Sequence, residues 1–197
     1  MWTHRLLEPD RPCVWPVRGL PAPANGPLPA TLSLDIPAGL SAITGGEGRG
    51  KTRLLRWLCG DAPGQVANAF HLDLRLPGDD ALTPEQVWQR LRAPCPRWDT
   101  DLQDALAQAL GLEAHREKAL FMLSTGSRRK VGLVATLASG ATLTGLDQPY
   151  MALDLASIAV LRSFLSDAAE QTQRAWLVAD YEADAALPWA SVIDLGE

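Results

Sequence analysis

The stretch Gly45-Gly46-Glu47-Gly48-Arg49-Gly50-Lys51-Thr52 decides the fold, because it matches the phosphate-binding pattern G-x-x-x-x-G-K-[ST] at every fixed position. A short apolar run at 40–44 enters it directly, as a buried strand does. After it, Leu54, Leu55 and Leu58 recur on one helical face. Strand, glycine loop and helix form the context that this motif needs. The sequence therefore predicts an α/β phosphate-binding unit here.

The chemistry of this phosphate loop follows from its backbone, since glycines let successive N–H groups point at one centre. The residues expected to surround the phosphates are Gly45, Gly46, Glu47, Gly48, Arg49, Gly50, Lys51 and Thr52. Lys51 is expected to reach the β- and γ-phosphates, and Thr52 to hold Mg²⁺ through its hydroxyl. Asp147 ends the uncharged run 141–147, where a second carboxylate for Mg²⁺ is expected, acting directly or through water.

Length and composition bound the class of protein. The 197 residues suffice for one well-buried domain, or for one domain with an inserted lobe. A net charge of −5 without a basic tract gives no electrostatic reason to expect nucleic acid as a partner. The three cysteines lack metal-ligand spacing and are expected to be reduced thiols. With no signal-peptide core and no long apolar run, a cytoplasmic location is expected.

Helices and strands alternate around the phosphate loop, which predicts a mostly parallel sheet covered on both faces. Prolines over residues 1–30 favour short edge strands, and the alternation at 70–76 predicts another strand. Residues from about 79 to 122 are expected to form a small helical lobe, with capping boxes that begin at Thr83 and Thr100. All of residues 1–197 are expected to belong to a single domain.

Trp15 has two interpretations. It precedes the phosphate loop on an expected strand, so its ring could stack on a nucleotide base. An aromatic side chain on a strand is more often part of the core, and the sequence leaves both roles open.

Two further motifs follow in order. Residues 123–130, which begin Leu123-Ser124-Thr125-Gly126, resemble the LSGGQ signature with a basic tail, and Met151-Ala152-Leu153-Asp154 resembles a loop that ends in Ala-Leu-Asp. With the phosphate loop and Asp147 they resemble the ATP-binding cassette (ABC) ATPases over nearly the whole chain. The compact length is most similar to small bacterial cassettes of the haem-exporter type. The resemblance implies a P-loop NTPase fold with a small inserted helical lobe and an N-terminal antiparallel β region.

In that family two cassettes pair head to tail, and ATP lies between one phosphate loop and the partner's signature. The resemblance implies that Ser124, Thr125 and Gly126 face the partner's ATP and that Asp154 belongs to the interface loop. Ser124 could instead be only a helix cap. The partner is a second copy or a paralogue, and an integral membrane permease would be a separate polypeptide, which would place the chain on the cytoplasmic face of the inner membrane.

The departures from the family's pattern fall at catalytic positions. Gln148 stands where a glutamate polarises the attacking water, and Asp180 stands where a histidine is usual. No glutamine lies near 73–77, where Arg75 is the closest by position. A neutral amide is a poor proton acceptor, so slow hydrolysis with intact ATP binding is expected.

Two functions follow from these observations. The first is an ATP-binding transporter subunit that couples ATP-driven dimerisation to a membrane permease. The alternative is a catalytically degenerate regulatory module that binds nucleotide without transport. A soluble ABC-like ATPase acting on nucleic acid ranks below both, because such proteins usually carry long insertions before the signature.

Overall fold

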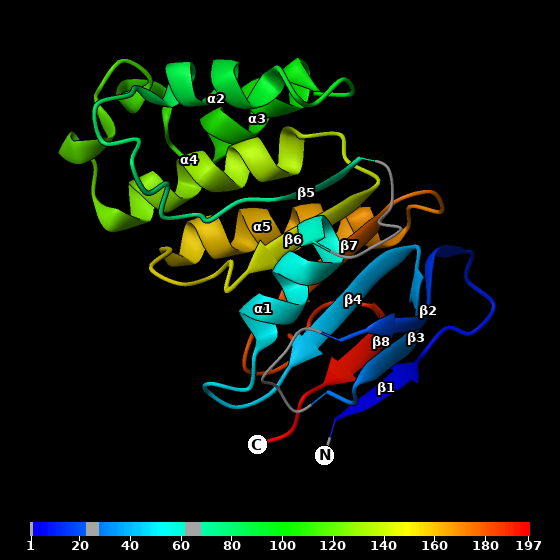
Figure 1. Cartoon of the computed structure of the whole chain (residues 1–197). Coiled ribbons are helices and arrows are strands. Elements are labelled where there is room, and N and C mark those ends of the chain that lie inside the picture. Colours follow the sequence, from blue (N-terminus) through cyan, green and yellow to red (C-terminus); the bar gives the residue numbers. More distant parts are fainter. Residues whose placement is uncertain (1, 23–27, 62–67) are drawn as a thin grey trace. The chain divides into compact units, whose positions relative to one another are not determined.

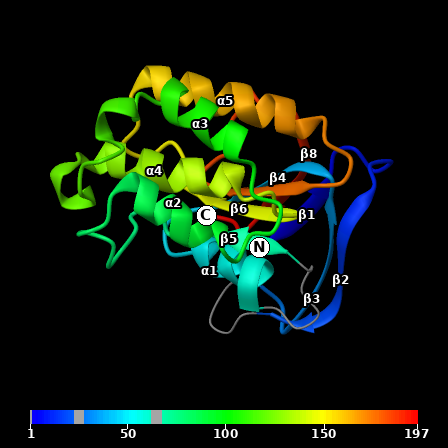
Figure 2. The same cartoon turned by 90° about the horizontal axis from the view of Figure 1, so that it is seen from above.

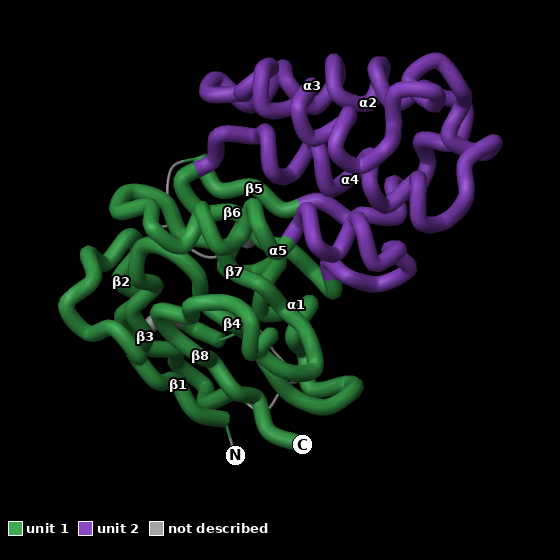
Figure 3. Tube along the Cα trace, turned by 180° about the vertical axis from the view of Figure 1, so that it is seen from behind, with its two compact units in different colours: residues 1–71, 142–148, 162–197 green, residues 72–141, 149–161 purple. Residues whose placement is uncertain are grey.

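The computed structural model describes residues 2–22, 28–61 and 68–197. The chain divides into two compact units (Figure 3). Unit 1 takes residues 1–71, 142–148 and 162–197, and unit 2 takes residues 72–141 and 149–161. Within the described ranges, no helix has both the length and the apolar character needed to cross a bilayer.

Unit 1 is built on a six-stranded sheet (Figure 1). Its strands, in spatial order, are β1 (Thr3–Leu6), β8 (Trp189–Asp194), β4 (Gly39–Thr44), β7 (Ala175–Ala179), β6 (Leu143–Asp147) and β5 (Ala69–His71). All neighbouring pairs are parallel except β1 with β8. A second, antiparallel sheet joins β2 (Cys13–Pro21) to β3 (Thr31–Pro37). The expected mostly parallel sheet and N-terminal antiparallel region are confirmed.

Helices lie against both faces of this sheet in unit 1. Helix α1 (Lys51–Arg56) continues into a π-helix, η1 (Trp57–Asp61), and α5 (Leu155–Ala169) begins in unit 2 and ends in unit 1. Trp176 on β7 packs edge-on against Phe164 of α5, with ring centroids 5.3 Å apart. The next residue, Leu177, belongs to the core that holds the buried leucines of α1. Because neighbouring strand residues point to opposite faces, β7 is covered on both sides.

Unit 2 is helical, with α2 (Pro84–Arg92), α3 (Thr100–Ala109), α4 (Thr125–Ala138) and the 3₁₀ turns η2 (Glu113–His115) and η3 (Leu120–Met122). Helices α3 and α4 pack side by side (Figure 2). The indole N–H of Trp88 on α2 donates to the Val131 carbonyl of α4 at 3.0 Å, which ties α2 to the same helix.

The two expected capping boxes have different outcomes. At α2, Thr83 and Gln86 bond each other's backbone N–H groups, as predicted. At α3 the expectation was wrong, because the cap is Asp99, whose side chain accepts from Leu102 N–H at 2.9 Å. Gln103 is instead buried, and its carbonyl oxygen accepts from the Trp98 indole at 3.0 Å. Burial of the amide among other polar groups removes it from the cap.

The strand expected at 70–76 was also too long. Strand β5 ends at His71, and Leu74 and Leu76 are buried within unit 2. A Cβ placed on Gly132 of α4 would lie 3.1 Å from the Leu74 Cα, so the chain there packs closely on a helix. The apolar alternation in this segment therefore reflects burial against α4 and not pairing in a sheet.

Candidate functional site

The phosphate loop joins β4 to α1 in a conformation that favours glycine at three positions. Gly45 has φ 140°, Gly48 has φ 74° and Gly50 has φ 91°, all in the region that L side chains avoid. A Cβ on Gly45 would also lie 2.9 Å from the carbonyl oxygen of Gly196. Gly50 precedes the first residue of α1, so its backbone turns the loop into the helix.

Lys51, the first residue of α1, is only 8% exposed. Its ammonium donates hydrogen bonds to the carbonyl oxygens of Gly45 at 2.6 Å and Gly46 at 2.8 Å. It also lies 4.5 Å from the centre of the Tyr181 ring, which is a cation–π contact. The lysine is thus folded back over its own loop.

A hollow of about 600 Å³ opens beside this loop within unit 1. It is lined by Glu47, Gly48, Arg49, Gly50, Lys51, Thr52, Arg53, Arg56, Trp57, Asp147, Gln148 and Tyr181. The fold therefore brings Asp147 and Gln148 to the same hollow as the phosphate loop. Gln148 has φ 44°, an uncommon value for a residue other than glycine, and its N–H donates to the Ala179 carbonyl at 2.8 Å.

Asp180 does not line this hollow, whereas the next residue does. The Tyr181 N–H donates to the Asp180 carboxylate at 2.8 Å. Burial raises the pKa of Asp180; that N–H and the Lys51 charge oppose the rise, and the Asp147 and Asp184 carboxylates add to it. The carboxylate is therefore close enough to Lys51 and Asp147 to feel their charges.

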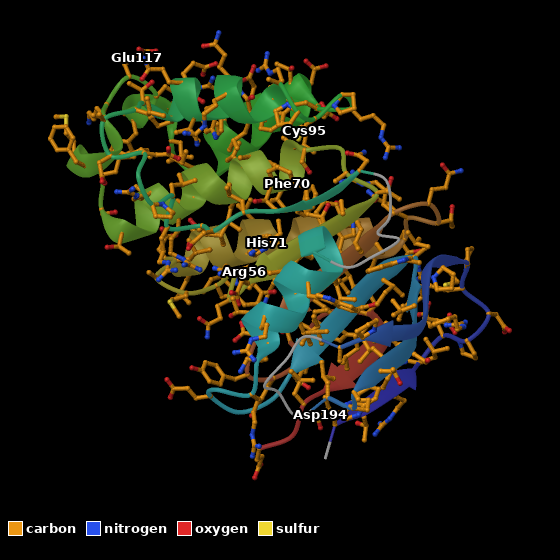
Figure 4. The ribbon with its side chains drawn as sticks, viewed as in Figure 1. Arg56, Phe70, His71, Cys95, Glu117 and Asp194 are labelled. Atoms are coloured by element: carbon orange, nitrogen blue, oxygen red, sulfur yellow. The ribbon has the colours of Figure 1, made fainter. Side chains whose placement is uncertain are left out.

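Sequence reasoning missed Tyr181, Arg53, Arg56 and Trp57 as lining residues. For Arg56 a signal was present, since it stands four residues after Thr52 and shares its helical face. Arg56 also lines a second hollow of about 330 Å³ in unit 1, together with Cys59, Phe70 and His71. Figure 4 labels Arg56, Phe70 and His71. Burial raises the pKa of the Cys59 thiol to about 12, so this thiol is neutral at physiological pH.

Trp15 is 5% exposed and belongs to the core of unit 1. It is not among the residues that line the hollow beside the phosphate loop. A buried ring has no free face to offer a nucleotide base. This burial favours the core role over the stacking role.

The signature segment, residues 123–130, lies in unit 2 and opens helix α4. Ser124 is the N-cap, and its hydroxyl accepts from the Ser127 N–H at 3.1 Å. Ser124 and Thr125 are both exposed. In this single chain Ser124 thus serves as a cap, and its side chain remains accessible.

The Ala-Leu-Asp loop, residues 152–154, lies in the same unit. Asp154 caps α5 by accepting from the Ser157 N–H at 2.8 Å, and it pairs with the Lys130 ammonium at 2.7 Å. Lys130, and after it the Ser157 N–H, hold the pKa of Asp154 well below its usual range. The signature helix and the Ala-Leu-Asp loop are therefore linked by a charge pair.

Arg75, the closest residue to the absent glutamine, is exposed and paired with a neighbour. Its guanidinium contacts both carboxylate oxygens of Asp73, at 2.7 and 2.9 Å. It also lines a hollow of about 360 Å³ in unit 2. This cation differs from glutamine in both charge and hydrogen-bonding pattern.

These features define a class of protein. A glycine loop between a central parallel strand and a helix, a buried lysine in that loop, and an aspartate at the end of a nearby parallel strand are the parts of a P-loop nucleotide-binding protein. The family model described as ABC transporter matches residues 30–151, and the chain belongs to this family.

Similar proteins agree with this assignment. The cytochrome c biogenesis ATP-binding export protein CcmA of Aromatoleum aromaticum is 34% identical over 190 residues, which is 84% of this chain and 87% of that protein. The protein of the same name from Pseudomonas syringae is 35% identical over 161 residues, 71% of this chain and 74% of that one.

Solved structures show the same fold. A putative ABC transporter ATP-binding protein from Pyrococcus furiosus superposes with a TM-score of 0.68 at 19% identity, covering 91% of this chain and 96% of that one. A putative cobalt transport ATP-binding protein gives a TM-score of 0.58 at 26% identity, covering 75% and 61%. The predicted family and fold are confirmed.

Proposed function

We propose that this chain is the ATP-binding subunit of an ABC transporter, and that it couples ATP-driven pairing of two cassettes to a separate membrane permease. The observation that carries the proposal is the hollow that brings Lys51, Thr52 and Asp147 together. The names of the similar CcmA proteins support an export role in cytochrome c biogenesis. We also propose that residues 1–197 act as one nucleotide-binding domain, with unit 2 containing the expected helical lobe.

The residues of the hollow suit ATP with Mg²⁺. Lys51 and the backbone of residues 45–50 supply positive charge and N–H donors to the phosphates. The Thr52 hydroxyl and the Asp147 carboxylate are hard oxygen ligands, of the kind that Mg²⁺ prefers. Bound Mg²⁺ would neutralise phosphate charge. Arg49 and Arg53 add positive charge to the same hollow.

We propose that a second cassette completes the site. The exposed Ser124 and Thr125, with Gly126, would meet the ATP held by a partner, which is either a second copy or a paralogue. The Ser124 hydroxyl at present donates to the Ser127 Oγ at 3.0 Å, and a charge-assisted bond to a phosphate is stronger than this neutral one. Asp154 would lie at the same interface.

Hydrolysis by this subunit is expected to be slow. Gln148 lines the hollow, but its amide cannot accept a proton from water as a carboxylate can. Asp180 would repel a γ-phosphate unless a cation or a proton intervened. ATP would therefore hold two cassettes together for long periods.

Light scattering of the purified chain with and without Mg-ATP tests this function. The expected result is a shift from the 21.2 kDa monomer to twice that mass, with Lys51→Ala as the matched control that stays monomeric. A monomer that binds ATP without pairing would contradict the homodimer and favour a paralogous partner. Co-purification with an integral membrane protein separately tests the proposed association with a permease. If no membrane protein co-purified, the result would favour the regulatory alternative.

A further inference from the structure

Among the described residues, the Lys51 ammonium makes two hydrogen bonds and one cation–π contact. A lysine has three N–H donors. Two are used by the carbonyl oxygens of Gly45 and Gly46, at 2.6 and 2.8 Å. The remaining face of the ammonium lies over the Tyr181 ring, 4.5 Å from its centre. A phosphate that approaches Lys51 must therefore displace one of these partners.

Of the three partners, the Tyr181 ring is the one that can leave. The two carbonyl groups belong to the backbone of the phosphate loop, whereas the Tyr181 side chain is 51% exposed and can rotate away. This ring also lines the hollow that the phosphates would enter. Phosphate and ring therefore compete for one cation.

The Tyr181 backbone is held in place independently of its ring. Its carbonyl oxygen accepts from the Gly45 N–H at 3.3 Å, and its own N–H donates to Asp180. These bonds keep the ring next to the phosphate loop. A change of the side chain leaves the bonds intact, so the ring can be tested without loss of the local fold.

We propose that Tyr181 is a gating residue of the nucleotide site. Its ring covers the Lys51 ammonium until a nucleotide polyphosphate displaces the ring. This inference rests on the proposed ATP-binding function and names the residue that sets its affinity. The chain can bind a polyphosphate only when the Tyr181 ring has moved away from Lys51. Because only a fraction of the molecules are in that state, the apparent affinity for nucleotide is reduced by that fraction. Because the Tyr181 ring is exposed, we use the range for cation–π contacts at exposed sites, which corresponds to about a two- to fivefold change in affinity.

Calorimetric titration with Mg-ADP and with a non-hydrolysable Mg-ATP analogue tests the gate. Tyr181→Leu is expected to bind both nucleotides about two- to fivefold more tightly, because the competing ring is gone. Tyr181→Phe keeps the ring and is expected to bind as the unchanged chain does. Phe121→Ala, which removes an exposed aromatic ring elsewhere in the chain, is the matched control.

Two results would overturn the gate. Equal or weaker binding by Tyr181→Leu would show that the ring does not compete with phosphate. Weaker binding by Tyr181→Phe would show that the hydroxyl contacts the nucleotide.

A measurement without nucleotide separates this inference from the proposed function. In the nucleotide-free chain, the Lys51 side-chain protons should show an upfield ring-current shift in the NMR spectrum, which Tyr181→Leu removes and Tyr181→Phe keeps. Absence of the shift would refute the contact itself. If the unchanged chain bound no nucleotide while the shift was present, the ATP-binding function would fail and the Lys51–Tyr181 contact would stand.

Discussion

Gly126 in the signature segment packs directly against the backbone of Ala152 in the Ala-Leu-Asp loop. A Cβ on residue 126 would lie 2.5 Å from the Ala152 carbonyl oxygen, closer than real Cβ contacts allow. Ala152 itself has φ 60°, so the loop adopts an uncommon backbone conformation at this contact. Glycine is required at residue 126 for packing between two motifs of one unit, apart from any role toward a partner's ATP.

Gly126→Ala is expected to destabilise the chain by about 1–3 kcal/mol, because the added methyl group must displace backbone. In an ordinary helix the same change would stabilise by up to about 1 kcal/mol. Urea unfolding measures the difference. Gly60→Ala is the control, since a Cβ there would meet no atom of the described residues within 4 Å, and its free energy of unfolding should stay near that of the unchanged chain or rise. Equal stability of Gly126→Ala and the unchanged chain would contradict the contact.

The Lys130–Asp154 pair predicts a pH-dependent stability difference. The folded-state pKa of Asp154 lies below its ordinary value of 3.8, so the stabilisation is fully present above pH 3.8 and is lost as pH falls through the folded-state pKa. Asp154→Asn keeps a capping side chain but removes the charge. Its melting temperature should lie below that of the unchanged chain at neutral pH and converge with it in acid. A gap that stays constant with pH would rule out the ion pair as the cause.

Gln148→Glu is expected to raise the ATP turnover number by about 10² to 10⁴, since it supplies the missing proton acceptor in the hollow beside the phosphate loop. The two side chains are nearly isosteric, so the backbone at φ 44° should be kept. Steady-state phosphate release measures the change, with Gln148→Glu combined with Lys51→Ala as the inactive control. An unchanged turnover number would favour a paralogous partner that supplies the catalytic groups.

Ser124 can be tested as a cap and as an interface residue at the same time. Ser124→Ala should lose about 1 kcal/mol of stability, because the Ser127 N–H loses its acceptor. Ser124→Asp keeps the cap but places a negative charge where a partner's phosphate would bind. It should therefore keep its melting temperature and lose the ATP-dependent mass shift in light scattering. A dimer that persists in Ser124→Asp would leave Ser124 with only its capping role.

A large part of the fold could be predicted from the sequence. The phosphate loop, the buried strands on both sides of it and the capping box at Thr83 were all readable locally, because burial periodicity and turn chemistry are properties of short stretches. Two local patterns predicted the wrong structure, one a strand and the other a helix cap. The alternation at 70–76 came from packing on α4, and Thr100 had Asp99 beside it as a competing cap. In both cases the local pattern allowed more than one structure, and contacts with distant residues selected one.

The sequence by itself determined that this chain is an ABC-type nucleotide-binding protein, since the order of its motifs and the glycines of its loop are encoded directly along the chain. Only the tertiary structure decided that Tyr181 lies over Lys51, that Gly126 meets Ala152, and that Trp15 is buried. The physical reason is that these contacts join residues from separate elements. Their distances are set by how strands and helices pack, which no local pattern of residues specifies.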